Sequence, residues 1–172
     1  MEAASSSCPG CGAVLAGGAL PYRGYYNCSA ECWSEYTHVL HAEYQDPALF
    51  AQVHQLSVDA FAVQHAGGAQ PDKSVCVHLF GLHLVLERGV AQAEVPARVQ
   101  QLVAAVAHWP HFELPTIRAA TTAHMIARST NPREHAAQAR IWAAQVWATW
   151  SAQHAAIAKL AALGFATSGS SA

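Results

Sequence analysis

The sequence has few charges and almost no lysine. Charged residues make up 12% of the 172 residues, the net charge is −2 with neutral histidines, and lysine occurs only at Lys73 and Lys159. The arginines are scattered and form no basic run, which argues against nucleic-acid binding because such proteins cluster cations to neutralise phosphates. The chain also lacks an uninterrupted apolar stretch of roughly twenty residues, so no membrane span is expected.

A secretory signal is also missing from the start of the chain. Residues Met1 to Ser7 are small and polar, with no apolar segment of the kind that directs export. We therefore expect a soluble, cytoplasmic protein. Apolar residues make up 52% of the chain, which is enough for one domain with a real core.

Four cysteines near the start are the most informative residues that are present. Cys8 and Cys11 form one close pair, and Cys28 and Cys32 form a second. Two such pairs can converge on one tetrahedral ion, and zinc is the usual occupant. Gly10 would permit the tight turn that aims the first two thiolates. The sequence therefore predicts a structural zinc site with Cys8, Cys11, Cys28 and Cys32 as ligands.

Other interpretations of these cysteines are less favoured. Disulfides need an oxidising compartment, for which the sequence gives no sign. Redox chemistry at Cys8 and Cys11 would fit a CxxC pair alone, but the second pair and the absence of a βαβ pattern argue against it.

Most of the remaining chain has a helical pattern. Asp46, followed by Pro47, and Asn131, followed by Pro132, are N-cap signals. We expect a hairpin near residues 14–26 and an irregular loop over residues 108–115, which contain two prolines. The expected helices cover residues 33–44, 47–66, 73–88, 96–108, 117–128 and 133–163.

This pattern predicts a mainly α protein, a helical bundle with a small N-terminal zinc lobe of the knuckle or treble-clef type carrying four cysteines. The lobe would cover residues 1–34 and the bundle residues 35–165, with a disordered tail at residues 166–172, which are rich in serine and glycine.

The chain contains eleven histidines, and those on expected helices can be sorted by face. His54, Phe61 and His65 share one apolar stripe, and His78 lies on the apolar stripe of the next helix. If the two helices pack together, His78 can meet His54 or His65 and form a metal or acid/base site. Satisfied core histidines are the alternative.

Asp59 lies about 140° round the helix from His54. It could be a solvated acid, a hydrogen-bond anchor, or a carboxylate that fixes the tautomer of an imidazole on another helix. A competing group, Cys76, His83 and Glu87, occupies the opposite face of the third helix, where a polar face without a site is the simpler interpretation.

Several runs of residues carry a resemblance to a known family. They are Cys8-Pro-Gly-Cys11-Gly12, Cys32-Trp33, Glu43-Tyr-Gln-Asp-Pro47, His54-Gln-Leu-Ser-Val-Asp59-Ala-Phe-Ala-Val-Gln64-His65 and Ser74-Val-Cys-Val-His78-Leu79. On these motifs the chain resembles a bacterial family of unknown function, DUF5946. The resemblance implies a pattern that includes His54, Asp59, Gln64, His65 and His78, and it names no reaction.

Two classes of function follow from these observations. The first is an enzyme in which His54, Asp59, His65 and His78 perform acid/base or metal-assisted chemistry on a small-molecule substrate, with a second metal at the histidines as one form of the site. The second is a zinc-dependent module that binds a protein partner, or a sensor that binds metal or haem, without catalysis. A homodimer could form through the aromatic loop at residues 108–115.

Overall fold

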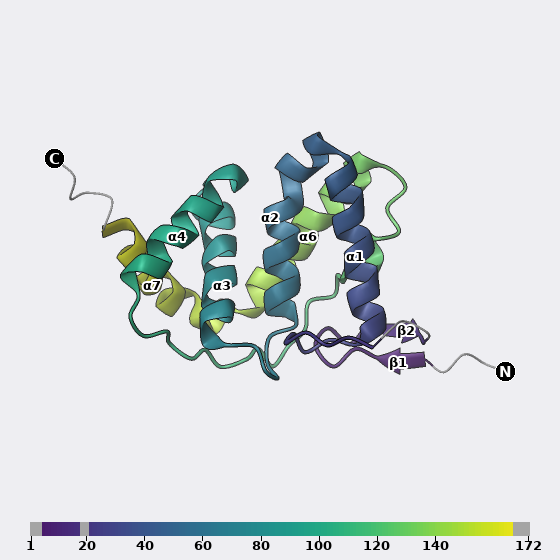
Figure 1. Cartoon of the computed structure of the whole chain (residues 1–172), viewed down its shortest axis with the longest axis horizontal. Coiled ribbons are helices and arrows are strands. Elements are labelled where there is room, and N and C mark those ends of the chain that lie inside the picture. The colour runs from purple at the N-terminus through teal and green to yellow at the C-terminus, as the bar shows by residue number, and fades with distance from the viewer. Residues whose placement is uncertain (1–4, 18–20, 167–172) are drawn as a thin grey trace.

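The computed structural model describes residues 5–17 and 21–166. Two short strands precede a bundle of helices in this part of the chain (Figure 1). In chain order the elements are β1 (Ser5–Ser7), β2 (Val14–Ala16), α1 (Ala30–Gln45), α2 (Pro47–Gln64), α3 (Asp72–Leu86), the 3-10 turn η1 (Gln92–Glu94), α4 (Val95–Ala105), α5 (Ala123–Ile126), α6 (Pro132–Thr149), the 3-10 turn η2 (Ser151–Gln153) and α7 (His154–Ala166).

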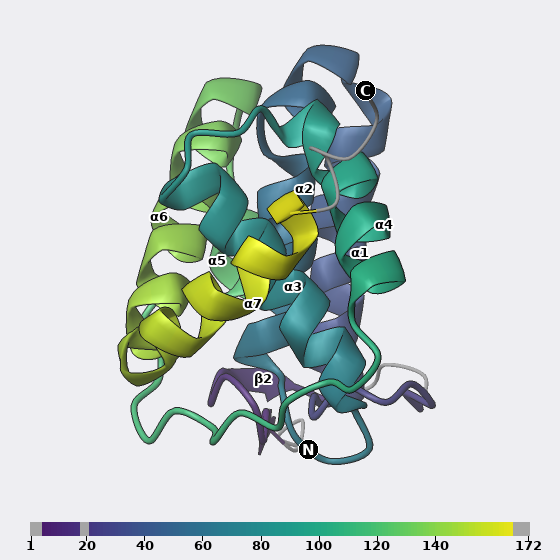
Figure 2. The same cartoon turned by 90° about the vertical axis from the view of Figure 1, so that its left-hand side faces the viewer.

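Helix α2 lies at the centre of the bundle. It packs against α1, α3 and α6, and Figure 1 shows α1 and α3 on its two sides with α6 behind it. Helices α4 and α7 pack against α3, and α7 crosses in front of α3 in Figure 2. The expected mainly α bundle is confirmed.

Capping residues place the helix boundaries close to where the sequence predicts them. Asp46 ends α1, and its carboxylate accepts hydrogen bonds from the backbone N–H groups of Ala48 and Leu49 at the start of α2. Asn131 caps α6 in the same way through the N–H of Glu134. Each cap satisfies backbone donors that a helix leaves without a partner.

The N-terminal hairpin differs from the expected one. Strand β2 pairs antiparallel with β1, with Ser6 opposite Leu15, so the hairpin encloses residues 8–13 and does not extend to residue 26. Residues 18–20 of the expected hairpin lie outside the described residues, as do residues 167–172 of the expected tail. The two strands therefore frame the first cysteine pair.

Two of the expected helices are also wrong. Helix α5 covers only Ala123–Ile126, because the backbone of Thr121 bonds to side chains of other helices: its N–H donates to Gln145 and its carbonyl accepts from Gln64. The long last helix is divided at Trp150, where the chain turns so that α7 can pack on α3 and α4.

Aromatic side chains fill the interior. Phe61 is fully buried and stacks on Tyr36 with 3.8 Å between ring centroids. Trp142 in α6 and Trp150 at its end are also almost completely buried. One buried cluster joins the N-terminal cysteines to the bundle core. None of the helices described here has the length and apolar character needed to cross a membrane.

A close approach between α2 and α3 depends on a glycine. A Cβ placed on Gly81 would overlap the carboxylate of Asp59, a fully buried group. Gly81 is therefore required for α3 to pack at this distance from α2.

We expect Gly81→Ala to destabilise the protein by about 2 kcal/mol or more, since overpacking in a core typically costs 1–3 kcal/mol. Gly164→Ala in α7 is the control, because its Cβ would sit at 3.4 Å from Leu102 and helix propensity favours alanine. Urea denaturation measures both. Equal stability of the two variants would show that α2 and α3 can separate without cost.

Candidate metal centre

Three cysteine sulfurs and one imidazole nitrogen converge at the N-terminal end of the bundle. The ligand atoms of Cys8, Cys11, Cys32 and His65 all lie within 4.8 Å of one another, and all four residues are buried. The Sγ atoms of Cys11 and Cys32 are 3.7 Å apart, and Cys32 Sγ is 3.3 Å from His65 Nε2. A tetrahedral zinc site would have about 3.8 Å between sulfurs and about 3.6 Å between sulfur and nitrogen. The group can therefore hold a metal ion.

The first two cysteines are placed by the turn between β1 and β2. The N–H of Cys8 donates to Ala13 O at 2.9 Å, and the N–H of Gly12 donates to Cys8 O at 2.9 Å. Gly12 has a φ of 80°, a conformation that glycine adopts without strain. The turn directs both sulfurs to one point.

Cys32 lies in the first turn of α1. The hydroxyl of Ser29 caps this helix by accepting from the N–H of Cys32 at 3.1 Å. The helix dipole is positive at this end and would stabilise the thiolate of Cys32 once a metal ion is bound.

His65 follows the last residue of α2 and is completely buried. Its Nδ1 is 2.8 Å from the carbonyl oxygen of Phe61, which can only accept, so Nδ1 carries the proton. When the ring is neutral, as in a metal-bound histidine, Nε2 has a free lone pair on the side that faces Cys32. This is the arrangement of a metal-bound histidine held by a backbone carbonyl. Gly10 packs on the ring so closely that a Cβ there would lie 2.7 Å from His65 Cδ2.

Without a cation the cluster cannot hold all of its thiols as thiolates. Hydrogen bonds with Cys11 and Cys32 lower the pKa of Cys8, whereas those with Cys11 and Cys8 raise the pKa of Cys32. Burial lowers the pKa of His65, but hydrogen bonds with Cys11 and Cys8 outweigh burial and raise it to about 9. The sulfurs thus oppose one another's ionisation, and a divalent cation would allow all of them to ionise.

The ligand set differs from the sequence prediction at one position. Cys28, expected as a ligand, lies outside the group and is only half-buried. Burial, followed by the charge of Cys8, raises its pKa to about 12, so it is held as a thiol. His65, expected to assist an acid/base pair, takes the fourth position because the end of α2 lies against the start of α1.

His54 lies in a second buried network that the sequence prediction missed in part. Its Nδ1 is 2.7 Å from Glu43 Oε2, while Ser57 Oγ and His135 Nε2 lie 2.6 Å and 3.1 Å from Glu43 Oε1. Glu43 is completely buried. Burial raises the pKa of Glu43, but the hydrogen bonds from His135, His54 and Ser57 outweigh burial, and the net shift is downward.

His78 forms a separate pair with Asp59. The distance from His78 Nδ1 to Asp59 Oδ1 is 2.8 Å, and Gln55 Nε2 donates to Asp59 Oδ2 at 3.0 Å. Burial raises the pKa of Asp59, and the contact with His78 offsets part of this rise. A fifth of the His78 side chain remains exposed, so the imidazole can exchange protons with solvent.

The structure therefore corrects the expected meeting of His54 and His78. No hydrogen bond joins them in the described residues, since His54 faces α1 and α6 while Asp59, about 140° round α2, faces α3. Gln64 has a structural contact: its side-chain oxygen Oε1 accepts from Trp142 Nε1 at 2.9 Å.

The competing group on α3 does not converge. Cys76 donates to the carbonyl of Pro110, and burial, followed by the charge of Asp72, raises its pKa to about 12. Glu87 accepts from Trp147 Nε1 at 2.7 Å, and the ring of His83 lies 6.0 Å from that of Trp147. Cys76 therefore contacts the loop at Pro110, while His83 and Glu87 contact α6.

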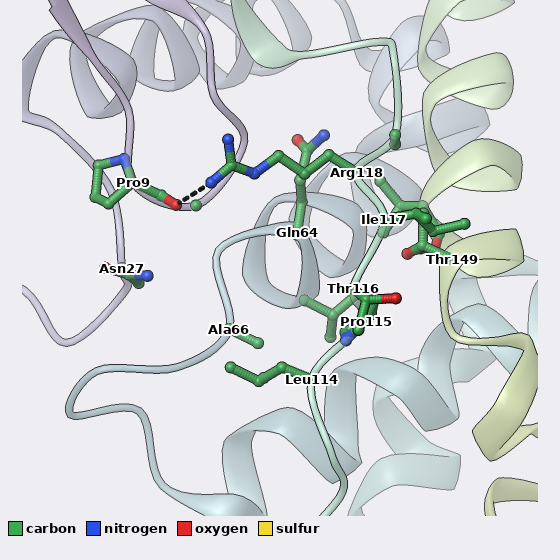
Figure 3. A pocket seen from close by; sticks show the side chains of 14 residues that line it. Pro9, Asn27, Gln64, Ala66, Leu114, Pro115, Thr116, Ile117, Arg118 and Thr149 are labelled. Atoms are coloured by element: carbon green, nitrogen blue, oxygen red, sulfur yellow. Dashed lines mark hydrogen bonds between the residues drawn. The ribbon is translucent and has the colours of Figure 1, made fainter.

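A pocket of about 530 Å³ lies next to the cysteine turn (Figure 3). Its wall includes Pro9 and Gly10, the end of α2, residues 114–119 and the end of α6. Arg118 extends across it and donates to the carbonyl of Pro9 at 3.1 Å. Sequence reasoning missed this pocket, because residues 114–119 come from a loop without a recognisable motif.

We expect Glu43→Gln to cost about 2–4 kcal/mol at pH 7, because two imidazoles and a hydroxyl lose a buried carboxylate. The lowered pKa of Glu43 means that this stabilisation is full above the unfolded carboxyl pKa of about 4.3 and is lost as pH falls through the folded value. The difference in stability between Glu43→Gln and wild type should therefore shrink below about pH 4. Thermal unfolding from pH 7 to pH 3, with exposed Glu94→Gln as control, measures this. A difference that stays constant over the range would contradict it.

Comparison with known proteins gives one result. No curated protein and no solved structure matches the chain. The sequence model of one family, described as a family of unknown function, matches residues 6–151. This range contains all four residues of the candidate metal centre together with the His54, His135 and His78 contacts to carboxylates. The chain accordingly belongs to the family of unknown function DUF5946.

Proposed function

We propose that this protein binds zinc, and that the Cys8, Cys11, Cys32 and His65 centre is structural. The observation that carries the proposal is the orientation of His65, whose Nδ1 donates to Phe61 O while Nε2 is directed at the sulfurs. A core histidine needs no such convergence with three cysteines. Thiolate sulfur and neutral imidazole together favour zinc over the harder cations.

Several features support a structural zinc ion over a catalytic one. Three thiolates and one imidazole complete a tetrahedron, which leaves no position for water or substrate. All four ligands are buried, and the ring of Phe61 packs 4.1 Å from that of His65. Bound zinc would fasten the turn after β1, the start of α1 and the end of α2 to one another.

We expect one zinc ion per chain. Cys32→Ser and His65→Ala should lose it and unfold at a much lower temperature, because structural zinc contributes several kcal/mol to folding. Cys28→Ser and Cys76→Ser are the matched controls and should keep it. Plasma mass spectrometry and thermal unfolding measure both properties. Loss of zinc from Cys28→Ser with retention in His65→Ala would contradict this ligand set and restore the four-cysteine alternative.

A second candidate function is acid/base catalysis at His78. The observation that favours it is the hydrogen bond from a partly exposed imidazole to a buried carboxylate, which orients His78 and leaves Nε2 to accept a proton. The pocket of Figure 3 includes neither residue, so a substrate would approach from the surface between α2 and α3. His54, paired with buried Glu43, would support the bundle. A second metal at the histidines would appear as two ions per chain.

We expect neutral His78 to carry its proton on Nδ1, because Asp59 accepts there. Long-range ¹H–¹⁵N correlation NMR at about pH 8, above the usual histidine pKa, detects the tautomer. Asp59→Ala should shift His78 toward the Nε2–H form. The same tautomer in wild type and variant would mean that Asp59 does not orient His78.

A further inference from the structure

The pocket beside the cysteine turn has the chemistry of an anion-binding site. Among the residues that line it, Arg118 is the only one with a charged side chain. Within the described residues its guanidinium forms no ion pair, and it donates a hydrogen bond to the neutral carbonyl of Pro9. The pocket therefore presents an uncompensated positive charge.

Further donors lie around the same cavity. Asn27 lines it, and its side-chain amide forms no hydrogen bond in the part of the chain that the structure describes. Thr116 adds a hydroxyl on the opposite side, as Figure 3 shows. No aspartate or glutamate lines the pocket. This combination disfavours a cation and suits a carboxylate or phosphate group, to which Arg can present several N–H donors at once.

The other part of the wall is apolar. Leu114 and Ile117 are 47% and 65% exposed, and both line the pocket together with Val63 and Ala66. A volume of about 530 Å³ falls within the range of small-molecule sites. An aliphatic part of a ligand would cover Leu114 while its charged end meets Arg118.

The position of the pocket is fixed from several sides. Gln64 is held by Trp142 and by the carbonyl of Thr121, and Thr149 Oγ1 donates to the carbonyl of Val146 at 2.6 Å. Asn27 is anchored through its backbone N–H, which donates to His65 O at 2.8 Å. A preformed pocket loses little entropy when a ligand binds.

We propose that this pocket binds a small organic anion, with a carboxylate or phosphate at Arg118 and an aliphatic part against Leu114, which lies on the same side of the loop as Arg118 in Figure 3. The inference goes beyond the zinc centre, which supplies only the adjoining wall. Unlike a catalytic proposal, it assigns no reaction.

Isothermal titration of the zinc-loaded protein with hexanoate and hexyl phosphate tests this assignment, with hexanol and hexylamine as neutral and cationic counterparts. We expect at least one anion to bind, about tenfold or more tightly than hexanol, and hexylamine not to bind. Inorganic phosphate tests whether the apolar wall contributes, and it should bind more weakly than hexyl phosphate. Equal binding of hexanol and the anions, or no binding of any anion, would overturn the proposal.

Variants locate the site. Arg118→Gln should weaken anion binding about tenfold or more, whereas Arg133→Gln, the same change on the opposite end of the bundle at the start of α6, should leave it unchanged. Because Arg118 also contacts Pro9, zinc content is measured in each variant. Thr116→Glu places a negative charge on the wall of the pocket and should weaken anion binding without removing the contact between Arg118 and Pro9. Unchanged anion binding in both Thr116→Glu and zinc-loaded Arg118→Gln would overturn the assignment. A variant that lost zinc but still bound the anion would contradict only the proposal for the metal centre.

Discussion

The burial of three cysteine sulfurs and one imidazole at a single point is the constraint on which the rest of this structure depends. Cys8, Cys11 and Cys32 bring three sulfurs together with His65 in a region from which solvent is excluded. Such a cluster is stable as thiolates only around a cation, and it then joins three segments distant in sequence. The turn carrying Cys8 and Cys11 also forms a wall of the pocket of Figure 3. A metal ion there would stabilise both the fold and the neighbouring cavity.

Helices α1 and α2 share a simple geometric relation that explains both buried polar sites. Cys32 and Glu43 are eleven positions apart on α1, and His54 and His65 are eleven apart on α2. Eleven residues make about three turns, so each pair lies on one face of its helix. Because the chain reverses at Asp46, Glu43 meets His54 at one end and Cys32 meets His65 at the other.

The sequence predicted the helical class, the starts of α2 and α6 at a capping residue followed by proline, and three of the four residues of the candidate metal centre. These features depend on local chemistry. The sequence did not predict that His65 lies with Cys8, Cys11 and Cys32 while Cys28 lies outside the group, since the spacing of two cysteine pairs says nothing about which helix end lies beside them. The pairing of His78 with Asp59 was anticipated as one alternative. His135 and Glu43 were missed, because their contact crosses from α6 to α1. The eleven-residue spacing was the available signal, and it becomes informative only when the two helices are known to be antiparallel.

The identity of the metal's ligands tests the account most directly. X-ray absorption spectroscopy at the zinc edge on the purified protein distinguishes sulfur from nitrogen by bond length. The account predicts three sulfurs at about 2.3 Å and one nitrogen at about 2.0–2.1 Å, with the imidazole scattering absent from His65→Ala. Four sulfurs and no imidazole would place Cys28 in the site and contradict the arrangement described for α1 and α2.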